Sequence, residues 1–146
     1  MLGKISAIIL LIILSPFLVI TALLILIFSG RPIFYRHKRC GFQFVEFDII
    51  KFRTMHPNDG SELTGYKDER ITSIGKFLRK YKIDELPQLF NIIKGDMGFI
   101  GPRPEAIQIV NSHRDYFSYL NTLKPGVTDI NSIIFQQGFY LLIFQQ

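Results

Sequence analysis

Residues 5–28 read ISAIILLIILSPFLVITALLILIF and contain no charged side chain. A straight helix over them would be about 36 Å long, slightly more than the ~30 Å hydrocarbon core of a bilayer. The length predicts a membrane-inserted helix. A cleaved signal peptide is disfavoured, because its apolar region is shorter and the sequence after Gly30 is basic. The four cations within residues 31–39 place the following portion on the cytoplasmic side.

A Ser-Pro pair interrupts the middle of this segment. Pro16 has no N–H to donate to the carbonyl of Ile12, and an unpaired carbonyl in lipid is costly. The Ser15 hydroxyl can donate to that same oxygen, which makes a bend tolerable. Each arm, roughly 15–18 Å long, is too short to cross a bilayer alone. A helix that returns to the same face and a kinked span both fit these lengths.

The chain is basic, with 17 Lys and Arg against 12 Asp and Glu and a formal net charge of +5. This balance favours anionic partners such as phosphorylated substrates, acidic lipid headgroups or nucleic acid. Nucleic acid is disfavoured, because the cations are dispersed among apolar positions and form no known nucleic-acid-binding motif. Cys40 is the only cysteine, so an intrachain disulfide is excluded.

The pattern of apolar residues after residue 40 indicates a mixture of helices and strands. Residues 42–55 are rich in aromatic and β-branched side chains, which is typical of one or two strands. Residues 72–81, and a second segment that opens at Asp84 and ends at Gly95, have the apolar spacing of amphipathic helices. Residues 56–67 are rich in turn-forming residues and predict a loop.

Two sets of charged residues in this portion allow a structural and a functional interpretation. Lys51 and Arg53 would share one face of an extended chain, and a solvated strand face is the simplest interpretation. Asp84 is most economically a helix N-cap, with Glu85 compensating the helix dipole. A carboxylate held ionised at a helix N-terminus also suits a nucleophile or a metal ligand. Two adjacent carboxylates near cations would suit a complex of Mg²⁺ with a diphosphate.

Several short motifs occur in order along the chain, and together with Ser15-Pro16 they resemble the bacterial sugar transferase family, the monotopic phosphoglycosyl transferases. The likeness covers roughly residues 8–128. It rests on Lys51-Phe52-Arg53-Thr54-Met55, Asp68-Glu69-Arg70-Ile71-Thr72, Asp84-Glu85-Leu86-Pro87-Gln88-Leu89, Asn91, Lys94-Gly95-Asp96-Met97 and Gly101-Pro102-Arg103-Pro104.

The resemblance implies a fold and a location. The fold would be α+β and mainly helical, with a re-entrant membrane helix over residues 1–30 that bends at Ser15 and Pro16. Residues 31–146 would form a small cytoplasmic catalytic domain with a short β element. The protein would lie in the bacterial cytoplasmic (inner) membrane, with its catalytic domain on the cytoplasmic side.

The resemblance also implies a reaction. Asp84 would attack the β-phosphate of a UDP-sugar, expel UMP and hold the phosphosugar covalently. Undecaprenyl phosphate would then take the phosphosugar. This would be the first membrane step in assembling a glycoconjugate such as O-antigen, capsule, exopolysaccharide or glycoprotein. Glu85 would coordinate Mg²⁺ beside the diphosphate.

The same resemblance implies roles for further basic residues. Lys51 and Arg79 would help to bind phosphate, and Arg70 is a further candidate for that task. Arg103 would contact the nucleotide from a stiff turn that Pro102 and Pro104 form around it. The residues leave open which sugar is transferred, which pathway uses the product and how the chain oligomerises.

The sequence departs from the family pattern in three places. The chain enters the apolar segment almost directly, and Gly98 stands where serine is common in the family. The segment Lys124–Thr128 is usually followed by Gly-Trp-Ala-Gln, whereas here Asp129 begins a different stretch that becomes apolar over residues 133–144. A catalytic domain shortened at its C-terminal end is therefore expected. The alternative function is that of an inactive relative that docks at the membrane and binds nucleotide or a partner.

Overall fold

The computed structural model describes residues 2–56, 68 and 70–129 and confirms an α+β fold that is mainly helical. The predicted loop over residues 56–67, apart from His56, and the apolar stretch over residues 133–144 lie outside the described residues. The elements in chain order are α1 (Leu2–Ser29), β1 (Phe34–Cys40), the 3₁₀ helix η1 (Phe42–Phe44), β2 (Glu46–Phe52), α2 (Ser73–Lys80), the 3₁₀ helix η2 (Ile83–Gln88), α3 (Leu89–Lys94), β3 (Gly98–Ile100), α4 (Ile107–Ser112), the 3₁₀ helix η3 (Ser118–Asn121) and β4 (Gly126–Thr128).

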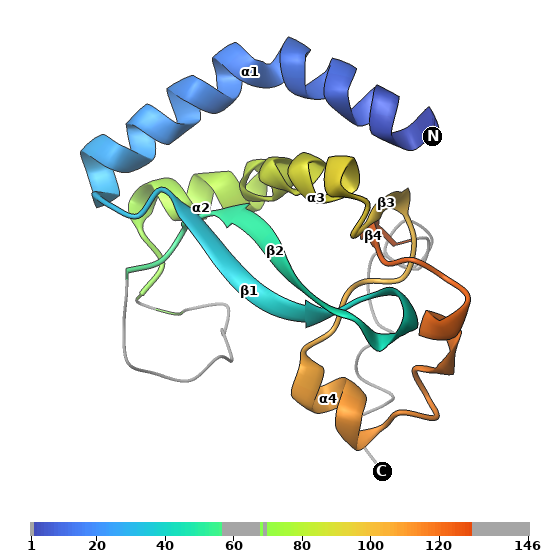
Figure 1. The fold of residues 1–146 in the computed structure, drawn as a ribbon. Coiled ribbons are helices and arrows are strands. Elements are labelled where there is room, and N and C mark those ends of the chain that lie inside the picture. The colour runs from blue at the N-terminus through green and yellow to red at the C-terminus, as the bar shows by residue number, and fades with distance from the viewer. Residues whose placement is uncertain (1, 57–67, 69, 130–146) are drawn as a thin grey trace.

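Helix α1 is continuous through Pro16 and curves as an arch over α2 and α3 (Figure 1). The Ser15 hydroxyl donates to the Ile12 carbonyl oxygen at 2.8 Å, as the sequence predicts. By length and composition α1 could cross a membrane, and most of its apolar side chains are exposed.

Both halves of α1 pack against the rest of the molecule. The first half joins the buried cluster Ala7, Ile49, Leu89, Ile92 and Met97. The second half joins the buried cluster Ile25, Phe52 and Leu78. Near the N-terminus the Lys4 ammonium also donates to the Lys94 carbonyl oxygen at the end of α3, at 3.3 Å. Helix α1 therefore lies along the domain instead of projecting from it.

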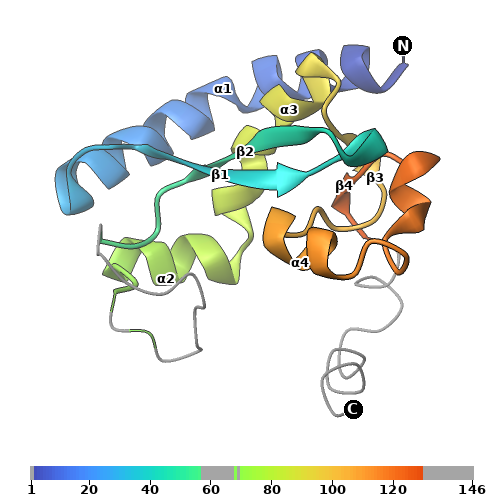
Figure 2. The same ribbon diagram turned by 60° about the horizontal axis from the view of Figure 1, so that its bottom comes forward.

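Strands β1 and β2 form an antiparallel hairpin whose register runs from Phe34 opposite Phe52 to Cys40 opposite Glu46. Figure 2 shows this hairpin between α1 on one side and α2 and α4 on the other. The sequence predicts strands only within residues 42–55, so β1 was missed. Its Arg36-His37-Lys38-Arg39 run has the composition of a membrane flank, and the apolar alternation that marks a strand is weak there.

Two backbone groups of β2 find their hydrogen-bond partner in one side chain from α3. Asn91 is fully buried, its Oδ1 accepts from the Ile50 N–H at 3.1 Å, and its Nδ2 donates to the Asp48 carbonyl oxygen at 2.7 Å. The amide thus replaces a neighbouring strand, since it offers both a donor and an acceptor. It fixes the register between β2 and the η2–α3 segment.

The helix predicted over residues 72–81 is confirmed as α2. The Thr72 hydroxyl caps it by accepting from the Gly75 N–H at 2.9 Å. The second predicted helix is correct at its end, where Gly95 adopts φ +97°, but wrong at its start. Lys82, at φ +57°, is the residue that precedes η2. Asp84 lies inside that 3₁₀ turn and is not an N-cap.

The remaining elements close the far end of the molecule. Strands β3 and β4 pair in parallel, with Gly98 opposite Gly126 and Ile100 opposite Thr128. Between them in sequence, α4 and η3 supply Val110 and Leu120 to a small cluster that also buries Cys40 and Phe117. The segment Gly101–Pro104 leads from β3 toward α4, and its Arg103 side chain reaches Glu85 of η2.

Candidate active site

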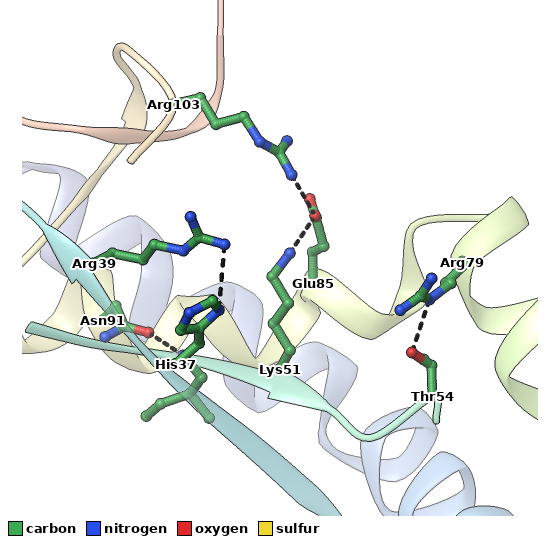
Figure 3. A network of polar contacts seen from close by, with 9 residues as sticks. His37, Arg39, Lys51, Thr54, Arg79, Glu85, Asn91 and Arg103 are labelled. Carbon is green, nitrogen blue, oxygen red and sulfur yellow. Dashed lines mark hydrogen bonds and ion pairs between the residues drawn. The ribbon is translucent and has the colours of Figure 1, made fainter. Parts of the chain in front are cut away.

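The hairpin and η2 bring Lys51 and Glu85 together, although they are far apart in sequence. The Lys51 ammonium donates to Glu85 Oε1 at 2.8 Å. The Arg103 guanidinium reaches the same oxygen from the opposite side at 3.9 Å (Figure 3). The Arg103 side chain remains 53% exposed, whereas that of Glu85 is mostly covered. One carboxylate thus lies between two cations supplied by separate elements.

Asp84 lies beside this group and is buried, with 8% of its surface exposed. Its Oδ1 is buried and has no hydrogen-bond partner among the residues that the structure describes. Burial raises the pKa of this carboxyl, and the charge of Glu85 raises it further. Lys51, Arg79 and Lys82 act in the opposite direction without reversing the shift. The helix dipole was expected to hold Asp84 ionised, but desolvation outweighs what one 3₁₀ turn supplies.

The pKa of Glu85 moves in the other direction. Burial alone would raise it, but the charge and hydrogen bond of Lys51, with the charges of Arg103 and Lys82, leave it below the usual value. Two neighbouring carboxyl groups with oppositely shifted pKa values are typical of active sites in which they have different roles.

Arg79 is held toward the carboxylates by Thr54. Its Nε donates to Thr54 Oγ1 at 2.8 Å (Figure 3), and Thr54 is buried just beyond the end of β2. The Thr54 carbonyl in turn accepts from the Thr72 N–H at 3.0 Å. Sequence reasoning quoted Thr54 only as part of a motif and gave it no role.

The other predicted substrate-binding residues take three different positions. Arg70 forms an ion pair with Asp68 at 2.5 Å, so its assignment to phosphate stays a prediction. The Pro102 carbonyl accepts from the Gly126 N–H at 3.0 Å, and Pro104 is buried. The hydrogen bond of Pro102 therefore holds the turn against β4, and Arg103 beside it points at Glu85.

Besides Thr54, three residues that shape this site were not assigned a role from the sequence. Lys82 contributes a charge that lowers the pKa of both carboxyls, and its place two residues before Asp84 was the available signal. Asn91 joins α3 to the backbone of β2. Arg53 was interpreted as a solvated residue but is 5% exposed and binds the end of α1. On β1, Arg39 and His37 form a further basic pair at 3.2 Å (Figure 3).

The carboxyl groups fit a magnesium ion that is bound mainly through substrate. Across the described ranges there is no group of three or more His, Cys, Asp or Glu that could enclose a metal. Mg²⁺ commonly needs only one or two carboxylates, together with phosphate oxygens and water. Asp84 Oδ1, buried without a hydrogen-bond donor, and the Glu85 carboxylate supply oxygens of that kind.

Comparison with known proteins finds similar sequences among curated sugar phosphotransferases. The 42% identity to the UDP-glucose:undecaprenyl-phosphate glucose-1-phosphate transferase of Caulobacter vibrioides extends over 71% of this chain and 39% of the relative. A UDP-N-acetylgalactosamine-undecaprenyl-phosphate N-acetylgalactosaminephosphotransferase from Aeromonas hydrophila is 39% identical over 78% of this chain and 28% of its own length. An undecaprenyl-phosphate glucose phosphotransferase from Komagataeibacter xylinus is 35% identical, over 84% and 25%.

The chain thus spans between a quarter and two fifths of the length of these curated relatives. The sequence model of the family described as bacterial sugar transferase matches residues 1–140, which is nearly the whole chain. The carboxylate pair, its cations and the apolar helix all lie within that match. The chain belongs to the bacterial sugar transferase family.

Proposed function

We propose that this protein transfers a phosphosugar from a UDP-sugar to undecaprenyl phosphate through a covalent intermediate on Asp84. The observation that carries the proposal is the buried Asp84 carboxyl beside Glu85, in a setting where Lys51, Arg79 and Lys82 act on its charge. The names of the relatives supply the substrate classes, since all three are undecaprenyl-phosphate sugar phosphotransferases.

The reaction proceeds in two displacements at the same phosphorus. A carboxylate oxygen of Asp84 bonds to the β-phosphorus of the donor, the bond to the bridging oxygen breaks, and UMP leaves with the electron pair. An oxygen of undecaprenyl phosphate then attacks that phosphorus, the bond to Asp84 breaks, and the carboxylate is regenerated. A carboxylate nucleophile splits one difficult transfer into two easier ones.

Charge neutralisation is the main requirement of phosphoryl transfer. Lys51 and Arg103 stand on either side of Glu85, where they can hold phosphate oxygens in line with Asp84. Arg79 approaches from α2 and is oriented by Thr54. When bound, Mg²⁺ would neutralise charge on the diphosphate, held by the Glu85 carboxylate with Asp84 Oδ1 beside it.

The geometry of α1 supports a site at the membrane surface. Its N-terminal end is hydrogen-bonded to α3 through Lys4. Its C-terminal end is hydrogen-bonded to Arg53, which directly follows β2. Since both ends contact one domain, the helix would enter the bilayer and return to the same face. The cations after residue 30 favour the cytoplasmic face of the inner membrane.

Intact-protein mass spectrometry tests the proposal. The protein is incubated with Mg²⁺ and, separately, UDP-glucose, UDP-galactose and UDP-N-acetylgalactosamine. We expect a mass increase of one phosphosugar with at least one donor, absent in Asp84→Asn and retained in Asp115→Asn, which changes an exposed aspartate. An adduct that persists in Asp84→Asn would refute the covalent role of that residue. Binding of nucleotide without any adduct would favour the inactive membrane-docked relative.

A further inference from the structure

Arg53 binds the end of the membrane helix. Its guanidinium donates from Nη1 to the Arg31 carbonyl at 2.6 Å and from Nη2 to the carbonyls of Gly30, at 2.8 Å, and Ser29. The last carbonyls of a helix lack intrahelical partners and carry partial negative charge. A planar guanidinium can satisfy several of them at once, which a lysine ammonium does less well. The end of α1 is therefore fixed by a buried cation.

The residues on either side of Arg53 contact either the site or the apolar core beneath α1. Lys51 donates to Glu85, Phe52 packs between Ile25 of α1 and Leu78 of α2, and Thr54 holds Arg79. Successive residues of an extended chain are ~3.3 Å apart, so Lys51 and Arg53 are separated by only about 7 Å of backbone. A single short segment connects the membrane helix to both sides of the carboxylate pair.

We infer that Arg53 is a positioning residue that fixes the depth of the Lys51–Glu85 pair relative to the bilayer. This inference rests on the proposed function. Arg53 has hydrogen bonds to the helix end and none of its contacts above involves Asp84 or Glu85, so it serves the reaction through other groups. The donor arrives from water and reaches Asp84 at any depth of the site. The acceptor phosphate is held at a fixed height by its lipid chain, so only its transfer step depends on that depth.

The two half-reactions separate these dependences. In vesicles, the Arg53→Gln variant should form the phosphosugar adduct at a rate within about twofold of that of the unmodified protein. Discharge of the adduct to undecaprenyl phosphate should slow by about tenfold or more, since misplacement of reacting groups by about 1 Å can cost about 10²-fold in rate. Discharge to a water-soluble short-chain polyprenyl phosphate should stay close to normal. Arg53→Lys keeps the charge but lacks the planar guanidinium. Its rate of discharge to undecaprenyl phosphate should lie between those of the unmodified protein and Arg53→Gln.

Arg31→Gln is the matched control, because it removes a cation at the same helix end while leaving the Arg31 carbonyl in place. It should leave both half-reactions unchanged. The inference is contradicted if Arg53→Gln slows adduct formation and discharge equally, or slows discharge to both acceptors equally. It is also contradicted if Arg53→Gln changes neither half-reaction. In those cases the unmodified protein still forms its adduct, so the proposed function stands.

A measurement without turnover covers the case in which the unmodified protein forms no adduct and the proposed function fails. The chain has no tryptophan, so Phe28→Trp places a single tryptophan at the exposed end of α1, which can be excited selectively over the tyrosines. Quenching by lipids brominated at different depths reports its position in the bilayer. Arg53→Gln should broaden that depth profile, because the released helix end samples several depths, whereas Arg31→Gln should not. Superimposable profiles would overturn the inference.

Discussion

Asp84 and Glu85 are chemically alike and adjacent, yet their surroundings give them different properties. Asp84 is buried without a described hydrogen-bond donor at Oδ1, whereas Glu85 is bound by Lys51. Their pKa values consequently move apart. The motif shows that two carboxylates are present, but local sequence does not show which of the two is paired with a cation. That depends on Lys51, which is 34 positions away in sequence.

The ionisation of Asp84 should set the acid limb of adduct formation. Its pKa is raised by burial, so the reactive carboxylate is lost on acidification at a higher pH than for an ordinary aspartate. Arg79 lowers that pKa, so Arg79→Met should move the acid limb to still higher pH as well as slowing the reaction. The pH dependence of the initial rate of adduct formation measures this, and a limb that stays in place or moves to lower pH contradicts the assignment.

Thr54 should act through Arg79. Thr54→Val keeps the shape of the side chain but removes the acceptor of the 2.8 Å hydrogen bond from Arg79. A hydrogen bond to a charged group is worth about 1.5–3 kcal/mol, so kcat/KM for the UDP-sugar should fall about tenfold or more. Thr54→Ser keeps the hydroxyl and should recover most of the activity. Equal losses in the two variants would show that packing, not the hydroxyl, matters there.

At the scale of elements, local patterns predicted what local forces determine. The apolar spacing of residues 72–81 predicts α2, and Gly95 predicts the end of α3, because amphipathic spacing and helix caps are short-range features. Strand β1 was missed because a strand rich in basic residues and the basic flank of a membrane helix look alike in sequence. The start of η2 was misplaced because Lys82 adopts a positive φ, which is uncommon for lysine and has no signal in composition.

Asn91 should be necessary for stability in a way its motif does not reveal. Asn91→Ala would leave the Ile50 N–H and the Asp48 carbonyl without their buried partner. Each such loss costs about 1–3 kcal/mol, so the free energy of unfolding should fall by roughly 2–5 kcal/mol. Denaturant titration in detergent, followed by circular dichroism, measures the change. Asn121→Ala, at an exposed position, provides the comparison, and similar small losses in both variants would contradict the role of Asn91.

At the scale of the whole molecule, long-range packing decides what the sequence leaves open. The Ser15 hydrogen bond to Ile12 follows from local chemistry, but a kinked span and a returning helix satisfy it equally. Contacts of both halves of α1 with β2, α2 and α3 favour the returning helix that we propose. The same packing brings Arg53 to the end of α1. Such partners come from distant parts of the chain, which is why Arg53 was interpreted as solvated.

Pro16 should control the curvature that permits these contacts. Pro16→Ala restores an N–H for the Ile12 carbonyl, which should straighten α1 and detach Lys4 from Lys94. The N-terminus would then move toward the far side of the bilayer. In a Cys40→Ser background, Gly3→Cys should become less accessible to a cytoplasmic thiol reagent. Val19→Ala, on the exposed part of α1, is the control, and an unchanged cytoplasmic location in Pro16→Ala defeats this prediction.

Identifying the residue that carries the phosphosugar tests the covalent role of Asp84 most directly. The protein is trapped with a reactive UDP-sugar before acceptor is added, digested, and its peptides are sequenced by mass spectrometry after borohydride reduction of the acyl phosphate. We expect reduction of the side chain at position 84, in the peptide containing Ile83–Gln88, and at no other carboxyl group. A phosphosugar attached to Glu85 or to any other residue, with Asp84 unmodified, would contradict it.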